Sequence, residues 1–285
     1  MSPLPPTGKD LPPLREVIAR HSLSARKALG QNFLLDLNLT RRIVRTAGVR
    51  AGERVLEIGP GPGGLTRALL EVGARVIAVE KDRRCIDSLG ELTDFFPQQL
   101  TVIEGDALVF DETTLADAGE PLKVVANLPY NIATALLVKW LTPKNWPSWF
   151  SSLTLMFQRE VAQRITAVPG SKAYGRLSIL AQWRCAAQRC FDVPRTAFVP
   201  PPRVTSSIVS LIPGKPLAEA EFADLERVVA TAFGQRRKML RASLKGLEVP
   251  VDDLLARAGL DPTLRAERLT IAEFCALARA YSALR

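Results

Sequence analysis

The sequence predicts an α/β fold, in which a Rossmann-like sheet with an antiparallel edge pair precedes a small all-helical domain. Up to about Leu211, short β-branched apolar runs alternate with helical patterns, which is typical of a parallel sheet covered on both faces. The last two expected strands lie close together without an obvious helix between them, which indicates the antiparallel pair. After Ile212 helical patterns continue to Arg285 without a strand candidate.

The expected elements follow from apolar periodicity, with edges that can shift by about two to four residues. The expected strands cover residues 54–58, 75–80, 100–104, 123–126, 153–157, 185–193 and 206–212. The expected helices before the C-terminal region cover residues 37–47, 65–71, 83–89, 134–141, 159–166 and 175–182.

The expected domain boundaries lie at changes in composition. Residues 1–23 are expected to form an N-terminal arm, partly disordered, because its first half is rich in proline. Residues 24–212 contain the strand–helix alternation, and residues 213–285 form the helical domain after a linker that begins with Pro213 and Gly214.

Composition narrows the classes of function. The 285-residue chain is 47% hydrophobic, has no apolar run of membrane-spanning length and lacks the layout of a signal peptide, so we expect a soluble cytoplasmic protein. Four scattered cysteines and a single histidine argue against a metal site and are more typical of cytosolic free thiols. The net charge of +9 fits a polyanionic partner, although excess lysine and arginine can simply aid solubility.

A glycine-rich turn predicts a nucleotide site. In "VLEIGPGPGGLTRALL", Gly59, Gly61 and Gly64 satisfy the G-x-G-x-x-G pattern between a strand and a helix. Glu80 ends the next strand, where it can accept hydrogen bonds from ribose hydroxyls. A turn that merely needs glycine for positive φ is the simpler alternative, but the acid at the end of the following strand favours the nucleotide site.

The residues around this turn favour S-adenosylmethionine over a dinucleotide. Pro60 and Pro62 remove two backbone N–H donors, which suits a ligand without phosphates. Glu57, before the glycines, can orient the turn or meet a cationic ligand, and Asp106, after a third strand, can accept from an adenine amino group. NAD is the second choice.

The stretch "KVVANLPYNIATALLVKWL" predicts a catalytic turn at the same edge of the sheet. An exocyclic adenine amine is a poor nucleophile, and two acceptors for its N–H groups, the Asn127 side-chain oxygen and the Leu128 carbonyl, favour a pyramidal nitrogen. Pro129 fixes the backbone, and the Tyr130 ring offers a face on which the base can stack. The alternative is an ordinary strand-terminal turn with a packed tyrosine. The predicted nucleotide site at the same edge of the sheet argues against this alternative.

Several motifs together resemble the small-subunit ribosomal RNA adenine N6,N6-dimethyltransferases, whose loss confers kasugamycin resistance. The resemblance covers nearly everything from Ser24 to the C-terminus. It is carried by "GQNFL" (30–34), "EIGPGPGGLT" (57–66), "NLPYNI" (127–132), "GSKAYGRLS" (170–178), "FVPPPRVTSSIV" (198–209) and "FGQRRKMLRASL" (233–244).

This resemblance implies a class I methyltransferase sheet and an activity. Methyl groups from S-adenosylmethionine would go to N6 of two adjacent adenosines in the 3′-terminal hairpin loop of small-subunit rRNA, giving N6,N6-dimethyladenosine. It further implies a role in small-subunit maturation, with rRNA in an assembling subunit as the partner. Together with the composition, we expect no membrane, no metal and a monomeric enzyme.

The resemblance also assigns residues that chemistry alone does not. The family's cofactor contacts correspond to Asn32, Leu34, Gly59, Glu80, Asp106 and Asn127, to which the sequence reading adds Glu57 and Gly61. Phe198 matches an aromatic residue that sandwiches the target base opposite Tyr130; without the resemblance it reads as a core phenylalanine. Ala133, where relatives often carry serine, departs from the pattern beyond the expected contacts.

A basic stretch near the C-terminus predicts RNA contacts. On one helix, Arg237, Arg241 and Lys245 would form a stripe, and few acids lie nearby in the sequence. A solvated basic face is the usual explanation for such a run, but a domain that acts on a nucleic-acid base favours phosphate contacts. The expected RNA-binding residues are Arg236, Arg237, Lys238, Arg241 and Lys245, and Arg159, Arg164, Lys172 and Arg176 can extend the surface.

Three alternatives stay open at this point. The large-subunit rRNA dimethylases share the region around the catalytic turn but typically have isoleucine at the Leu128 position. A binding protein that kept the fold without turnover is opposed by the intact set of Glu80, Asp106 and Asn127–Tyr130, which leaves open a second, non-catalytic role in subunit assembly. An NAD-dependent oxidoreductase is opposed by Pro60 and Pro62.

Overall fold

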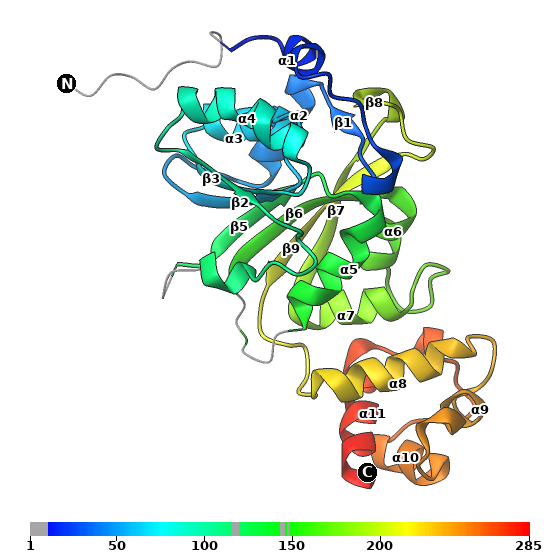
Figure 1. The fold of residues 1–285 in the computed structure, drawn as a ribbon. Coiled ribbons are helices and arrows are strands. Elements are labelled where there is room, and N and C mark those ends of the chain that lie inside the picture. The colour runs from blue at the N-terminus through cyan, green and yellow to red at the C-terminus, as the bar shows by residue number, and fades with distance from the viewer. Residues whose placement is uncertain (1–10, 116–119, 143–145, 147–148) are drawn as a thin grey trace. The chain divides into compact units, whose positions relative to one another are not determined.

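A computed structural model describes residues 11–115, 120–142, 146 and 149–285 of the chain (Figure 1). The chain divides into two compact units. The first comprises Met1–Leu137, Ser148–Ala162 and Gln188–Ile212, and the second comprises Val138–Pro147, Gln163–Ala187 and Pro213–Arg285. No helix among the described residues has both the length and the apolar character needed to cross a bilayer.

The first unit is built on a seven-stranded sheet with the order β4-β3-β2-β5-β6-β9-β7. Neighbouring strands from β4 to β6 are parallel, whereas β9 runs antiparallel to β6, with β7 beside it at the edge. The predicted parallel sheet with an antiparallel edge pair is therefore confirmed. The strands are β2 (Arg54–Ile58), β3 (Arg75–Glu80), β4 (Leu100–Glu104), β5 (Leu122–Ala126), β6 (Phe150–Gln158), β7 (Cys185–Val193) and β9 (Ser206–Pro213).

Helices alternate with most of the parallel strands, as the sequence pattern predicts, but two of them have different limits. The helices are α2 (Leu37–Thr46), α3 (Gly64–Glu71), α4 (Arg83–Phe95), α5 (Tyr130–Leu141) and α6 (Arg159–Ile165). Helix α4 runs six residues beyond the expected end at Leu89. Helix α5 begins at Tyr130 and not at Thr134, so the aromatic residue of the predicted catalytic turn is the first residue of a helix.

Two short elements near the N-terminus were not expected. Helix α1 (Leu14–Arg20) buries Leu14 and Val17, so this part of the expected arm is ordered; the residues before Leu11 lie outside the described part of the chain. Strand β1 (Phe33–Leu34) pairs antiparallel with β8 (Phe198–Val199), which joins "GQNFL" to "FVPPP". Strands of two residues carry no detectable periodicity.

The second unit is helical and contains α7 (Arg176–Arg184), α8 (Phe222–Gly234), α9 (Leu240–Ser243), α10 (Val251–Ala258) and α11 (Ile271–Leu284). Its core gathers Ile179 and Trp183 of α7 with Val229, Leu254 and Phe274. The sequence-based boundary at residue 212 left α7 in the first domain, whereas the contacts place it here. The reason is that the apolar face of α7 packs on helices far along the chain, which local periodicity does not report.

Candidate active site

The glycine-rich turn between β2 and α3 lies directly under the N-terminal strand β1. A Cβ on Gly64 would lie 2.3 Å from the Leu34 carbonyl oxygen, and one on Gly61 would lie 3.4 Å from the Phe33 ring. Gly61 also has φ +56°, in the left-handed region that favours glycine. These glycines therefore allow the segment around Phe33 and Leu34 to close over the turn.

Glu57, at the end of β2, is a buried acid. Burial raises the pKa of Glu57 from 4.5 to about 8, and the nearby Glu80 carboxylate acts in the same direction. The Thr66 hydroxyl lies near enough to lower the pKa, but it does not form a hydrogen bond of good geometry, so the buried Oε2 atom stays unsatisfied among the described residues. A buried acceptor without a partner costs free energy, so the site is suited to a ligand that brings a donor or a positive charge.

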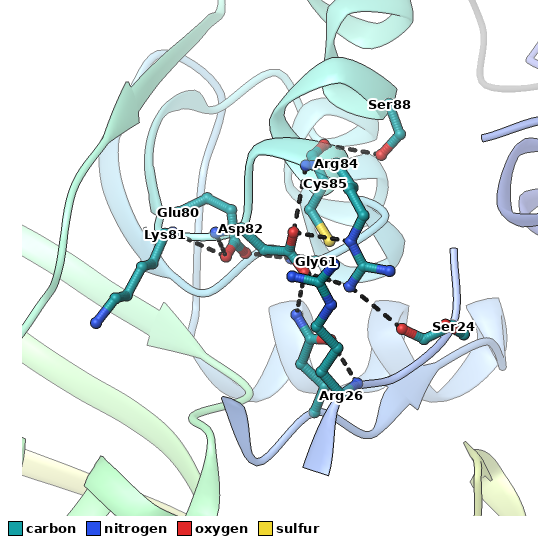
Figure 2. Close-up of polar contacts among 10 residues, drawn as sticks. Ser24, Arg26, Gly61, Glu80, Lys81, Asp82, Arg84, Cys85 and Ser88 are labelled. Atoms are coloured by element: carbon teal, nitrogen blue, oxygen red, sulfur yellow. Dashed lines mark hydrogen bonds and ion pairs between the residues drawn. The ribbon is translucent and has the colours of Figure 1, made fainter. Parts of the chain in front are cut away.

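Glu80, at the end of β3, is fixed by three backbone donors (Figure 2). Gly61 N–H donates to Oε2 at 3.0 Å, and the N–H groups of Lys81 and Asp82 donate to Oε1, each at 2.8 Å. Burial raises the pKa of Glu80, and the backbone donors oppose this shift. The carboxylate is thus held in one orientation at the glycine-rich turn.

Asp106, beyond the end of β4, is paired with a lysine. Lys81 Nζ donates to Asp106 Oδ2 at 2.7 Å, and Leu108 N–H donates to Oδ1 at 3.0 Å. Lys81 follows Glu80 at the carboxyl edge of the sheet. Its position next to a strand-terminal acid is the sequence signal that could have identified Lys81 as a site residue. A ligand donor that approaches Asp106 would meet a carboxylate already pre-oriented by these two donors.

The turn after β5 carries the predicted catalytic residues. Asn127 Nδ2 donates to the Asn32 carbonyl oxygen at 3.3 Å, which leaves the Asn127 side-chain oxygen to act as an acceptor. The Pro129 carbonyl accepts from Ile132 and Ala133 N–H and so begins α5. Tyr130 Oη and Ser206 Oγ lie 2.5 Å apart, a bond that ties the tyrosine to the start of β9.

One cavity of about 280 Å³ joins these groups. Its lining includes every predicted cofactor residue, namely Asn32, Leu34, Glu57, Gly59, Gly61, Glu80, Asp106 and Asn127. It also includes Leu128, Pro129 and Tyr130, so the predicted nucleotide and catalytic sites share one space. Gln31 and Lys81 also line this cavity, although the sequence pattern did not predict them as site residues.

Phe198 lies elsewhere in this structure. It is not among the residues that line the cavity, and only 2% of it is exposed, because it packs in the core with Leu34 and Ile208. Its backbone pairs with Leu34 in the β1–β8 ladder. The structure thus shows a core phenylalanine here, and a role opposite Tyr130 stays a prediction.

The predicted basic stripe does not lie on one helix. Helix α8 ends at Gly234 and α9 begins at Leu240, so residues 235–239 form a non-helical segment between them. Arg236 is partly buried and pairs with Glu267 at 2.9 Å, while its Nη2 donates to the Ser171 carbonyl at 3.3 Å. The remaining predicted cations, Arg237, Lys238, Arg241 and Lys245, are exposed; we call them the exposed cation set.

The described residues contain no group of three or more histidine, cysteine, aspartate or glutamate side chains placed to hold a metal ion. Cys85 and Cys185 are buried free thiols, and burial raises the pKa of each to about 12. Such thiols are poor nucleophiles at neutral pH, so the chemistry of the cavity rests on its acids, amides and tyrosine.

Comparisons with known proteins agree with this geometry. A family model for ribosomal RNA adenine dimethylase matches residues 22–282. A ribosomal RNA small subunit methyltransferase A from Xanthobacter autotrophicus is 59% identical over 97% of this chain and 96% of that protein. Its counterpart from Dinoroseobacter shibae is 60% identical over 96% of this chain and 98% of that protein.

Two solved structures resemble the chain in fold and sequence. A dimethyladenosine transferase from Plasmodium falciparum has a TM-score of 0.70 and 27% identity, covering 85% of this chain and 94% of that one. The 23S rRNA methyltransferase ErmE has a TM-score of 0.66 and 28% identity, covering 88% of this chain and 100% of that one. These neighbours confirm the predicted class I methyltransferase fold.

Proposed function

Because the chain belongs to the ribosomal RNA adenine dimethylase family, we propose that it methylates small-subunit rRNA with S-adenosylmethionine as methyl donor. The chain is an rRNA methyltransferase, and the proposal specifies the reaction. N6 of two adjacent adenosines in the 3′-terminal hairpin loop becomes N6,N6-dimethyladenosine, within an assembling small subunit. The observation that carries the proposal is the single cavity that holds both the acids of β2 to β4 and the turn Asn127–Tyr130.

The cavity fits S-adenosylmethionine by its chemistry. Glu57 Oε2 is a buried acceptor without a partner, as expected for the receptor of a cationic group. Glu80 has a fixed carboxylate for ribose hydroxyls, and Asp106 has one for the adenine amine. When bound there, S-adenosylmethionine supplies a methyl group on a positively charged sulfur.

The turn after β5 would prepare the target base. The Asn127 side-chain oxygen and the Leu128 carbonyl accept the two N–H groups of the adenine amine, which favours a pyramidal nitrogen. Asn127 is held for this role because its Nδ2 donates to the Asn32 carbonyl at 3.3 Å. The Tyr130 ring is held by Ser206 and can stack on the base, which aligns the amine for in-line attack. The methylated nitrogen becomes cationic and loses its proton to water, so no strong base is required.

The small-subunit target is favoured over the large subunit by the relatives that match this chain. The two bacterial relatives named above are about 60% identical over nearly the full length, whereas ErmE is 28% identical. We propose that the exposed cation set contacts RNA phosphates, since cations without partners are available for a polyanion. Arg236 instead holds the segment between α8 and α9 through Glu267.

The decisive experiment measures methyl transfer from labelled S-adenosylmethionine to unmethylated small ribosomal subunits, with large-subunit rRNA as the comparison. The product nucleosides are then identified. N6,N6-dimethyladenosine from the small subunit alone supports the proposal, and Tyr130→Ala should lower its formation about a hundredfold while cofactor is still bound. Label only in large-subunit RNA would assign the chain to the other branch of the family. Bound cofactor without transfer to either RNA would indicate a binding factor.

A further inference from the structure

Gln31 joins the N-terminal segment to the end of β3. Its Nε2 donates to Asp82 Oδ2 at 3.0 Å, and its Oε1 accepts from Arg26 N–H at 2.9 Å. Gln31 lies within residues 28–34, all of which line the cavity. Both ends of this side-chain amide are therefore used to hold one wall of the cavity in place.

The Asp82 carboxylate, which accepts this bond, is also held by Arg84, as Figure 2 shows. It is 5% exposed, and Arg84 donates to it from Nη2 at 2.6 Å and from Nε at 3.0 Å. The Arg84 and Gln31 donors hold the pKa of Asp82 down to about 2, so it is ionised throughout the working range. Arg84 Nη2 also reaches the Ser24 carbonyl at 3.3 Å, which ties the same segment a second time.

The Asp82 backbone also contacts Glu80, the acid that we propose to bind the cofactor ribose. Its backbone N–H donates to Glu80 Oε1 at 2.8 Å, while Glu80 Oε2 accepts from Gly61. Its carboxylate begins α4 by accepting from Arg84 N–H at 3.2 Å. Asp82 therefore contacts both Gln31 and Glu80, and Glu80 in turn contacts Gly61 of the glycine-rich turn.

Asn32, which follows Gln31 in the chain, connects this segment to the turn after β5. Asn32 Nδ2 donates to the Gly30 carbonyl at 3.4 Å, and the Asn32 carbonyl accepts from Asn127 Nδ2 at 3.3 Å. A continuous path of hydrogen bonds and one peptide unit therefore runs from Glu80 through Asp82, Gln31 and Asn32 to Asn127.

We propose that Gln31 and Asp82 form a latch that positions the N-terminal segment against the cofactor cavity and orients Asn127 for catalysis. They are positioning residues, which act through Asn32 and Glu80 and need no contact with the reacting atoms. This inference rests on the proposed function, because it concerns how tightly S-adenosylmethionine is held and how Asn127 is presented. Releasing the latch should weaken cofactor binding and also slow the chemical step.

The test replaces the neutral amide of the latch by a carboxylate. Gln31→Glu sets two negative groups against each other, and Gln98→Glu, at an exposed position, is the control with the same change in charge. We expect Gln31→Glu to raise the Kd of S-adenosylhomocysteine about tenfold or more, as for the loss of a hydrogen bond to a charged group. Gln98→Glu should leave it unchanged. Equal Kd values for the two variants would overturn the proposal.

A second substitution separates a latch from a general loss of structure. In Gln31→Glu/Asp82→Asn, the Asn amide can donate to the new carboxylate, so the pair is restored with donor and acceptor exchanged. The double variant should bind within about threefold of Asp82→Asn alone, which is the signature of direct coupling. If Asp82→Asn does not relieve the Gln31→Glu defect, the two residues do not act as a pair.

Two further readouts complete the test. With saturating cofactor, Gln31→Glu should still lower kcat on small-subunit rRNA, and an unchanged kcat would refute the link to Asn127. In the ligand-free protein, trypsin should cut after Arg26 faster in Gln31→Glu than in Gln98→Glu, and equal rates would refute the latch even if the chain bound no S-adenosylmethionine. Failure of the wild-type chain to bind the cofactor would instead count against the proposed function.

Discussion

The variant Glu57→Gln tests the raised pKa of Glu57, a buried acid that lines the cavity. In the wild-type chain without ligand, the pKa of Glu57 rises from 4.5 to about 8 because the carboxyl group is buried beside Glu80. The folded state therefore binds a proton that the unfolded state releases above pH 4.5. Stability from this group is fully present below pH 4.5 and is lost as pH rises toward 8. Glutamine does not titrate, so the free energy of unfolding of the variant does not fall with pH for this reason.

The magnitude follows from the two pKa values. Between pH 5 and pH 7, the wild-type free energy of unfolding should fall by about 2 to 3 kcal/mol more than that of Glu57→Gln. Other titrating groups are common to both proteins and cancel in the difference. The buried amide can lower the stability of the variant at every pH, so the diagnostic quantity is the slope and not the absolute level.

The assay is urea unfolding of both proteins at pH 5, 6 and 7 without cofactor, followed by circular dichroism and by fluorescence. Coincident transitions from the two probes would justify a single free energy at each pH. Parallel pH profiles for the wild type and Glu57→Gln would refute the reasoning, because they would mean that Glu57 titrates near its ordinary pKa in the folded protein.

The remaining predictions concern the turn after β5, the exposed cation set and the glycine-rich turn. Tyr130→Ala should lower kcat/KM for RNA by about a hundredfold or more, with cofactor Kd unchanged, because a 1 Å misplacement of the base is costly; equal losses in both would exclude a stacking role. Replacing Arg237, Arg241 and Lys245 by alanine should reduce the slope of log K against log salt by about 2 to 3 units, with circular dichroism as the folding control, and an unchanged slope would mean a solvated face. Gly64→Ala should weaken S-adenosylhomocysteine binding, measured by calorimetry, because its Cβ would lie 2.3 Å from the Leu34 carbonyl, whereas Gly90→Ala, with open space around it, should not.

The parallel strands and the acids at their ends are predictable from the amino-acid pattern alone. Strands β2, β3 and β4 have the residues that the apolar pattern predicts, since a buried strand is apolar at successive positions. Because parallel strands present their carboxyl ends at one edge, the sequence alone predicts that Glu57, Glu80 and Asp106 lie close together. The turn at Asn127 was predicted for the same reason.

The contacts between segments far apart in the chain depend on packing that no local pattern predicts. The β1–β8 pair, the burial of Phe198 and the bond from Asn127 to Asn32 each join residues with no local pattern in common. The assignment of α7 to the second unit and the pairing of Arg236 with Glu267 are of the same kind. Periodicity reports which face of an element is buried, but the partner that buries it is fixed by packing over the whole chain.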